Sequence, residues 1–295
     1  MNQAKVLNFF GLLLIMFGIS FAIPLFVAIF YGESLIRVFA LGMSILVLIG
    51  FLSWFFTKDN KQELSLSDGF VITVLFWIVL SVSGSIPFIL FGFGVVDSFF
   101  ESMSGITTTG ATVIAGLDDL PKSLLIYRQL LQWLGGMGLI VLAIAVMPLL
   151  GIGGGQLFKT QTPGPMSEQR LTPRITSTAR ALWSIYFVLT VLCIFAYRLA
   201  GMSYFDAVSH AFSTVSIGGF STHDLSIGFF DSLSIEIVCI TFMLLSAMSF
   251  AVHYSAIYRK QVLKYFYDPE LRFFVSLLIV ILGLVCLSLF ANDID

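Results

Sequence analysis

The sequence predicts an all-α integral membrane protein, and three observations carry this prediction. Hydrophobic residues make up 58% of the chain and charged residues only 11%, whereas a typical soluble domain has about 25% charged residues. The long apolar runs suit spanning helices and exceed the length of membrane-barrel strands. Between these runs, one short amphipathic segment occurs twice. A soluble globular protein and a β-barrel are therefore excluded.

Seven apolar runs are long enough to cross a bilayer as helices. The first is too long for the apolar region of a signal peptide and lacks a small-residue cleavage site, so we expect it to remain in the mature protein. The predicted spans are residues 6–30, 35–56, 70–94, 124–150, 181–200, 232–258 and 271–290.

The distribution of charge across these spans predicts an orientation. With a cytoplasmic N-terminus, eleven of the fifteen lysines and arginines fall in cytoplasmic segments and four fall outside, as the positive-inside rule requires. Eleven of the seventeen acidic residues then lie on the outer side. A negative outer mouth attracts cations. The plainer alternative is that acidic residues only avoid the inner side, since they contribute little to topology.

The duplicated segment covers residues 97–112 and 206–221, which are related by a shift of 109 positions. Each copy is a short amphipathic stretch followed by a run of serine, threonine and glycine, which is a poor helix former. Non-helical backbone at membrane depth is tolerated only where it is buried in protein or lines a watery cavity. The repeat therefore predicts two re-entrant elements. The matching positions include Asp97 with Asp206, Ser104 with Ser213, Gly110 with Gly219 and Thr112 with Ser221.

The first copy has the features of a cation-binding turn. We expect Asp97 or Ser98 to cap a short helix that runs from the outer side to about Ile106, so that its negative C-terminal end points into the membrane. Residues 107–112 then return in an extended turn, in which Gly110 supplies φ values closed to other residues. Such a turn can aim several carbonyl oxygens at one axis, where they replace the water shell of K⁺.

The second copy follows the same logic, with Asp206 as the expected cap, a helix to about Val215 and a return over residues 216–221. Two ordinary glycine-containing loops are the alternative interpretation. The matched cap, length, glycine and flanking spans favour a true repeat. The repeat alone does not indicate whether the bound cation is K⁺ or Na⁺.

Several longer motifs carry a family resemblance. They are TTTGAT, YRQLLQWLGGMGLIVLAIAVMPLLG, GGGQLFKTQTPGP, LTPR and SIGGFST. Together they resemble the TrkH/TrkG subunits of the Trk/Ktr/HKT potassium transporter superfamily over essentially the whole chain. The resemblance implies two leading helices followed by repeats of M1, pore helix, filter and M2. It implies a leading two-helix segment (1–66), a first pore repeat (67–151), a cytoplasmic loop (152–178), a second pore repeat (179–260) and the first helix of an incomplete third repeat (261–295).

The resemblance also implies a selectivity filter of backbone carbonyls, with potassium as the bound ion. Relatives with serine in place of the first filter glycine tend to admit Na⁺, and both runs here keep glycine. The implied potassium-binding residues are Thr108, Thr109, Gly110 and Ala111 in the first run and Ile217, Gly218, Gly219 and Phe220 in the second.

The resemblance implies a pore-forming subunit of a Trk system, acting in potassium uptake or symport across the inner (plasma) membrane of a bacterium. Uptake is drawn by the membrane potential, which supplies about 2.3 kcal/mol per unit charge per 100 mV. A cytosolic nucleotide-binding regulatory subunit of the TrkA kind is the implied partner, with residues 152–178 as one candidate contact. Membrane lipid is also expected as a partner, and nucleic acid is not.

The family has four such repeats in one chain, whereas this sequence has two and the beginning of a third. A ring with missing sectors cannot replace a full hydration shell. Two expectations stay open: a truncated, non-conducting membrane subunit or fragment that needs further repeats, or two chains that pair as a homodimer. An intramembrane protease would need GxSG with a helical histidine, HExxH or paired membrane aspartates. The sequence has none of these, so no enzyme is expected.

Other residues near the repeats have two interpretations each. Glu101 on the first pore helix and His210 on the second either support the filter by hydrogen bonds, which we favour, or face the outer vestibule. Arg128 either pairs with a nearby carboxylate or snorkels to the interface. His223 is expected in a wet outer loop. The motif WLGGMG at 133–138 is expected to pack closely beside the filter.

Overall fold

The computed structural model describes residues 3–58, 66–146 and 175–291. Every regular element in these ranges is an α-helix or a short 3₁₀ helix, which confirms the predicted all-α class. In chain order these are α1 (Gln3–Ser20), α2 (Ala22–Tyr31), α3 (Ile36–Thr57), α4 (Leu66–Phe91), α5 (Val95–Ile106), η1 (Leu117–Asp119), α6 (Lys122–Val146), α8 (Ile175–Leu199), α9 (Tyr204–Val215), η4 (Ser226–Phe230), α10 (Leu233–Ala247), α11 (Phe250–Tyr258), α12 (Lys264–Tyr267) and α13 (Pro269–Ala291).

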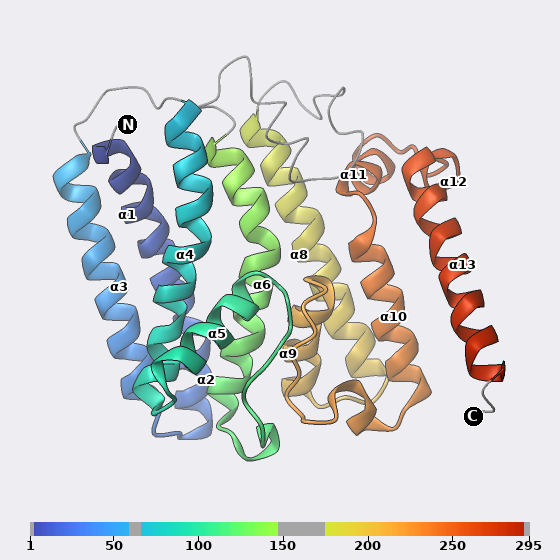
Figure 1. Cartoon of the computed structure of the whole chain (residues 1–295), viewed down its shortest axis with the longest axis horizontal. Helices are drawn as coiled ribbons and strands as arrows, with labels where there is room; N and C mark the ends of the chain where they lie inside the picture. Colours follow the sequence, from blue (N-terminus) through green and yellow to red (C-terminus); the bar gives the residue numbers. More distant parts are fainter. Residues whose placement is uncertain (1–2, 59–65, 147–174, 292–295) are drawn as a thin grey trace.

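Long helices stand side by side, with the short helices α5 and α9 among them (Figure 1). Five described helices are long and apolar enough to cross a membrane, and the bent pair α10–α11 is a sixth candidate. Helix α6 covers the predicted span 124–150 as far as the described residues reach, but it is not one of these candidates. The predicted first span, 6–30, is one apolar stretch with a break between α1 and α2. Pro24 accounts for the break, because it has no N–H for the carbonyl one turn earlier.

A buried tyrosine joins the leading helices to the first repeat. Tyr127 of α6 is fully buried, and its ring lies 5.2 to 5.4 Å from the rings of Phe21, Phe39 and Phe88. Its hydroxyl donates to Gly84 O at 2.7 Å, so its polar end is also satisfied. The cluster fixes α6, the helix that backs both re-entrant turns.

The start of α6 is capped by a side chain from another part of the chain. Glu33, in the turn between α2 and α3, accepts hydrogen bonds from Lys122 N at 2.7 Å and Ser123 N at 3.1 Å. Its carboxylate satisfies two N–H groups that have no partner inside the helix, and it lies at the positive end of the helix dipole. The leading hairpin therefore sets the position of α6 at this end as well.

A tryptophan joins the two repeats. Trp133 of α6 packs against Phe212 of α9 and Tyr186 of α8, with ring centroids 5.2 and 5.7 Å apart. Its indole N–H donates to Thr190 Oγ1 at 3.0 Å. Because Trp133 contacts both α8 and α9, the second repeat is held against the same helix as the first.

The predicted span 232–258 is not one continuous helix in the structure. Helices α10 and α11 meet at 94° instead. The backbone at Met248 and Ser249 is extended, with ψ values of 148° and 124°. His253 of α11 is buried, and its Nε2 donates to Leu245 O at 2.7 Å. This bond satisfies a carbonyl that the end of α10 leaves without a helical partner.

The WLGGMG motif packs against the inner ends of α5 and α9, as predicted. A Cβ built on Gly135 would lie 1.9 Å from Ile106 O, and one on Gly136 would lie 3.1 Å from Ser216 Cβ. Small residues allow this close approach of helices in a membrane.

We expect Gly135→Ala to lower the free energy of unfolding by about 1–3 kcal/mol, because α5 and α6 must separate. Gly283→Ala on α13 is the matched control, since its Cβ would meet nothing within 4 Å. Alanine there should stabilise the helix by about 0.5–1 kcal/mol. Thermal unfolding in detergent measures both, and a neutral Gly135→Ala would contradict the close contact.

Helix α13 stands apart from the rest of the bundle (Figure 1). Leu271 is its one buried residue, and most of its surface beyond the first turn is apolar and exposed. A helix that is apolar all round is typical of lipid or protein surroundings on every side.

Candidate functional site

Two helices of equal length enter the bundle from one end. Helices α5 and α9 have 12 residues each, and both their first and their last residues differ by the 109-residue shift of the sequence repeat. In Figure 1 both start at the end opposite to the N-terminus and stop part-way along the spanning helices, and the chain then returns to that end. This is the predicted re-entrant arrangement.

The predicted caps of these helices are wrong by about one turn. Gly94 precedes α5 and makes no side-chain cap, so Asp97 lies inside the first turn, and Ser98 is buried within the helix. Ser203 is the cap of α9, because its Oγ accepts from Asp206 N at 3.1 Å and donates to Asp206 Oδ2 at 2.6 Å. Ser203 thus caps the helix through the backbone N–H of Asp206, and the Asp206 carboxylate holds the Ser203 hydroxyl in place.

The two return turns have the same backbone conformation. Thr108 and Gly110 have φ values of 55° and 78°, and their counterparts Ile217 and Gly219 have 54° and 86°. The residue between each pair has a negative φ. Alternation of left- and right-handed residues directs successive N–H groups to one side of a run and the carbonyls to the other.

The N–H groups of both runs bond back to the pore helices in matching pairs. Thr109 N donates to Ser104 O at 2.9 Å, and Gly218 N donates to Ser213 O at 2.8 Å. Because these N–H groups are used on the protein side, the alternation leaves carbonyl oxygens for the opposite side. The C-terminal ends of α5 and α9 add partial negative charge nearby.

The two turns lie against each other. A Cβ on Gly110 would lie 2.1 Å from Gly218 O, and one on Gly219 would lie 4.0 Å from Gly110 Cα. Two segments more than a hundred residues apart in the sequence therefore form one site.

The eight residues predicted to bind potassium differ in exposure. Residues with exposed surface are accessible to an ion, whereas the buried residues pack behind them. Exposed are Thr109, Ala111, Ile217 and Gly219, intermediate are Thr108 and Gly110, and buried are Gly218 and Phe220.

Glu101 and His210 occupy matching places on α5 and α9, and both are buried, so the vestibule alternative is wrong. Thr112 Oγ1 donates to Glu101 at 3.0 Å. The Nε2 of His210 lies 3.0 Å from Ser221 Oγ, and its Nδ1 lies 3.0 Å from Asp206 O. Each side chain thus holds the hydroxyl that ends its return run.

Arg128 does not snorkel to an interface; it is fully buried beside both turns. It pairs with Glu101 at 2.7 Å and donates to Thr112 Oγ1 at 3.0 Å in the first repeat. In the second repeat it donates to Ser221 O at 3.1 Å, and its guanidinium lies 4.4 Å from the centre of the Phe220 ring. One side chain therefore ties the outer ends of the two return runs together.

The chain that carries these two turns resembles known proteins in sequence and fold. The sequence matches the TrkH family, described as cation transport proteins, over residues 35–294. The chain belongs to the TrkH family. Its expected character as a transport protein rather than an enzyme agrees with that family.

Individual relatives carry the same family name. The Trk system potassium uptake protein TrkH of Halomonas elongata is 48% identical over 291 residues, which cover 98% of this chain and 60% of that protein. TrkG of Escherichia coli K12 is 45% identical over 283 residues, covering 95% of this chain and 58% of TrkG. The crystal structure of the potassium transporter TrkH from Vibrio parahaemolyticus aligns with a TM-score of 0.85 at 46% identity, over 99% of this chain and 60% of that one. This TrkH-family chain thus spans about three-fifths of the length of those relatives.

Two glutamines that the sequence analysis did not select also reach the second turn of this TrkH-family chain. Gln132 is bonded to Gly218 O and Phe220 N. Gln129, with its amide oxygen turned toward Thr222 N, accepts from it at 3.1 Å. The available signal was polar side chains beside Arg128 inside an apolar helix, which are costly in a membrane unless they have partners.

The loops beyond the two turns are joined by carboxylates. Asp224 accepts from Gly116 N and Leu117 N, each at 3.1 Å. His223 donates from Nδ1 to Asp118 and stacks on Phe229 with centroids 3.5 Å apart. It lies in the loop as expected, but its side chain is only 16% exposed, because it packs on Phe229 and bonds to Asp118.

This contact makes a pH-dependent contribution to stability. The hydrogen bond from His223 holds the pKa of the Asp118 carboxyl below its ordinary value. A carboxyl whose pKa is lower in the folded state stabilises the fold above its unfolded pKa, about 3.9, and that stability is lost as the pH falls through the folded pKa. We expect Asp118→Asn to lose less stability than the wild type on acidification below about pH 4. Thermal unfolding at several pH values measures this, with Asp119→Asn as the neighbouring control expected to follow the wild type; equal acid sensitivity in all three would contradict it.

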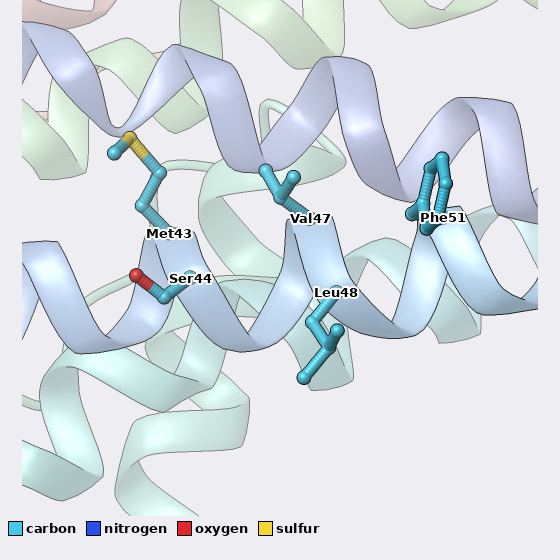
Figure 2. A pocket seen from close by; sticks show the side chains of 5 residues that line it. All are labelled: Met43, Ser44, Val47, Leu48 and Phe51. Atoms are coloured by element: carbon cyan, nitrogen blue, oxygen red, sulfur yellow. The ribbon is translucent and has the colours of Figure 1, made fainter.

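A separate pocket of about 330 Å³ lies on α3. Figure 2 shows its lining by Met43, Ser44, Val47, Leu48 and Phe51. The one polar group, the Ser44 hydroxyl, already donates to Ala40 O at 2.8 Å. This lining offers no charge to an ion.

Proposed function

We propose that this chain supplies two filter-bearing repeats of a Trk-type potassium uptake protein. One observation carries the proposal: two glycine turns with the same alternation of backbone handedness meet at the inner ends of two re-entrant helices. N–H groups of the turns bond to the pore helices and to Gln132, which leaves carbonyl oxygens to replace the water around a cation. Among these oxygens, Gly218 O also accepts from Gln132. K⁺ is the transported ion in this proposal, as in the names of the relatives.

Backbone carbonyls of both runs bind the ion in this proposal. Glu101 and His210 hold the ends of the runs, and Arg128 holds the two ends together. The potassium-binding residues are Thr108, Thr109, Gly110 and Ala111 with Ile217, Gly218, Gly219 and Phe220.

The proposal extends to location and partners. The protein lies in the bacterial inner membrane with a cytoplasmic N-terminus, which the charge distribution supports. A TrkA-like nucleotide-binding subunit regulates it from the cytosol, and a second copy of the chain is its partner in the membrane. The division into a leading segment, 1–66, and pore repeats, 67–151 and 179–260, belongs to the same proposal.

A membrane subunit or fragment that binds K⁺ but does not conduct without further repeats is the second candidate. The uncovered apolar surface of α13 favours it, because such a surface suits packing against further helices. The exposed side of the turns favours it too, since two runs surround an ion only in part.

Two measurements test the proposal and separate it from the second candidate. The chain is expressed in a bacterium that lacks potassium uptake, and rubidium uptake is followed. The purified protein is melted in KCl, NaCl and choline chloride, where a bound ion raises the melting temperature by mass action. Uptake together with stabilisation by K⁺ over Na⁺ supports conduction. Stabilisation without uptake supports the second candidate, and the absence of both overturns the proposal.

A further inference from the structure

A glutamine of the first repeat clamps the filter turn of the second. Gln132 of α6 is fully buried. Its Nε2 donates to Gly218 O at 2.7 Å, and its Oε1 accepts from Phe220 N at 3.0 Å. The side-chain amide thus bridges the peptide groups on either side of Gly219, whose φ is 86°. Both peptide groups would be buried without a partner if the amide were absent, which is costly.

The clamp depends on glycine at position 218. A Cβ on Gly218 would lie 2.4 Å from Cδ and Oε1 of Gln132, so no other residue leaves room for the amide. The matching residue of the first run is Thr109, which carries a side chain and is exposed. The two turns therefore share their backbone handedness but differ in what lies behind them.

The clamped oxygen belongs to the predicted filter. Gly218 O is one of the proposed potassium ligands, and it also lies against Gly110 of the first run. A carbonyl oxygen has two lone pairs, and Gln132 engages one of them. The direction of this carbonyl is thus set by a side chain from the neighbouring repeat.

The residues of α6 that contact the second turn lie on one polar face of the helix. Arg128, four residues before Gln132 and so on the same helix face, donates to Ser221 O at 3.1 Å. The positions of α10 that correspond to Arg128 and Gln132 by the 109-residue shift are Ile237 and Thr241. The clamp therefore belongs to α6 and is not repeated on α10.

We propose that Gln132 is a positioning residue that sets cation selectivity. By fixing the peptides around Gly219 from the neighbouring repeat, it fixes the spacing of the carbonyl oxygens that distinguish K⁺ from Na⁺. Without the amide, these peptides are free to turn, and a turn that adapts to the smaller ion discriminates less. The inference rests on the proposed function.

The first test variant is Gln132→Met, which keeps the length of the side chain and removes both hydrogen bonds. Calorimetric titration of the purified full chain with KCl and NaCl gives the two dissociation constants. We expect the preference for K⁺ over Na⁺ to fall about fivefold to tenfold, because the loss of two buried hydrogen bonds affects the binding of both ions and only part of it distinguishes them. Tyr127→Phe is the matched control, because it loses the buried bond to Gly84 O on another face of α6 and should keep the wild-type preference.

The second variant, Gln132→Glu, separates positioning from simple packing. A glutamate here accepts from Phe220 N in either state but donates to Gly218 O only when protonated. Its preference for K⁺ should be low at neutral pH and recover on acidification, whereas Gln132→Met should show no recovery. The other charged or titratable groups, Arg128 on α6, Glu101 on α5 and His210 on α9, are unchanged in these variants, so the wild-type profile gives their contribution.

The outcomes distinguish a failure of the role of Gln132 from a failure of the proposed potassium-uptake function. A wild type that binds K⁺ no better than Na⁺ overturns the proposed function, and the role of Gln132 falls with it. A wild type that prefers K⁺, together with an unchanged preference in Gln132→Met or a pH-independent one in Gln132→Glu, overturns the role of Gln132 alone.

Discussion

Replacing Arg128 with methionine is expected to lower the free energy of unfolding by about 3–5 kcal/mol, because it removes one partner of a buried ion pair. Glu101 is as fully buried as Arg128 and would remain as an uncompensated charge. The substitution also removes the donor to Ser221 O and Thr112 Oγ1 and the cation above the Phe220 ring. Denaturant unfolding of the purified protein in detergent, followed by tryptophan fluorescence, measures the loss.

A double variant separates the charge from the packing. Glu101→Leu combined with Arg128→Met removes both charges, and replacing a buried pair by apolar residues is often close to neutral, so most of the lost stability should return. Arg198→Met is the control, because Arg198 is exposed and donates to Met202 O at 3.0 Å. Its loss should stay below about 1 kcal/mol. Equal losses at Arg128 and Arg198 would contradict a buried pair that joins the repeats.

The re-entrant elements could be predicted from the sequence because their signals are local. Apolar run length, a short amphipathic stretch and a glycine at a fixed position are all read within a few dozen residues. The 109-residue shift then predicts that whatever holds for Thr108 and Gly110 holds for Ile217 and Gly219, and the φ values agree. The small-residue motif at 133–138 is local in the same sense.

The residues behind the turns could not be predicted in this way, because their roles are set by tertiary contacts. The sequence shows that Arg128 lies in an apolar helix, but its partner Glu101 is 27 positions away and Ser221 is 93. Nothing near Gln132 in the chain indicates that Gly218 lies opposite it. The repeat itself misleads here, since the corresponding positions of α10 are Ile237 and Thr241, which carry neither a guanidinium nor an amide.

The break between α10 and α11 was missed for a different reason. Residues 232–258 are apolar enough for one span and contain no proline or glycine that would predict an end. The bend is stabilised by His253, which reaches back to Leu245 O and also contacts Tyr265 in the following segment. Such a helix end depends on a side chain beyond it, which apolar periodicity does not report.

Serine at the two matching glycines is expected to have unequal effects on ion binding. Gly110 and Gly219 have φ values of 78° and 86°, so a side chain at either costs about 1–2 kcal/mol of backbone strain. At Gly110 the new Cβ would also lie 2.1 Å from Gly218 O, a backbone atom. At Gly219 the nearest atom is Gly110 Cα, at 4.0 Å.

Gly110→Ser must therefore push the two turns apart and separate the carbonyl oxygens of the two repeats. We expect its affinity for K⁺ to fall about tenfold or more, with loss of the preference over Na⁺, while Gly219→Ser keeps binding with a smaller shift in ion choice. Gly201→Ser controls for strain alone, because Gly201 has φ 110° and its Cβ would meet nothing within 4 Å. Calorimetric titrations with KCl and NaCl measure all three. A wild-type affinity in Gly110→Ser would remove the reason for placing the ion between the turns, because the site requires them to touch.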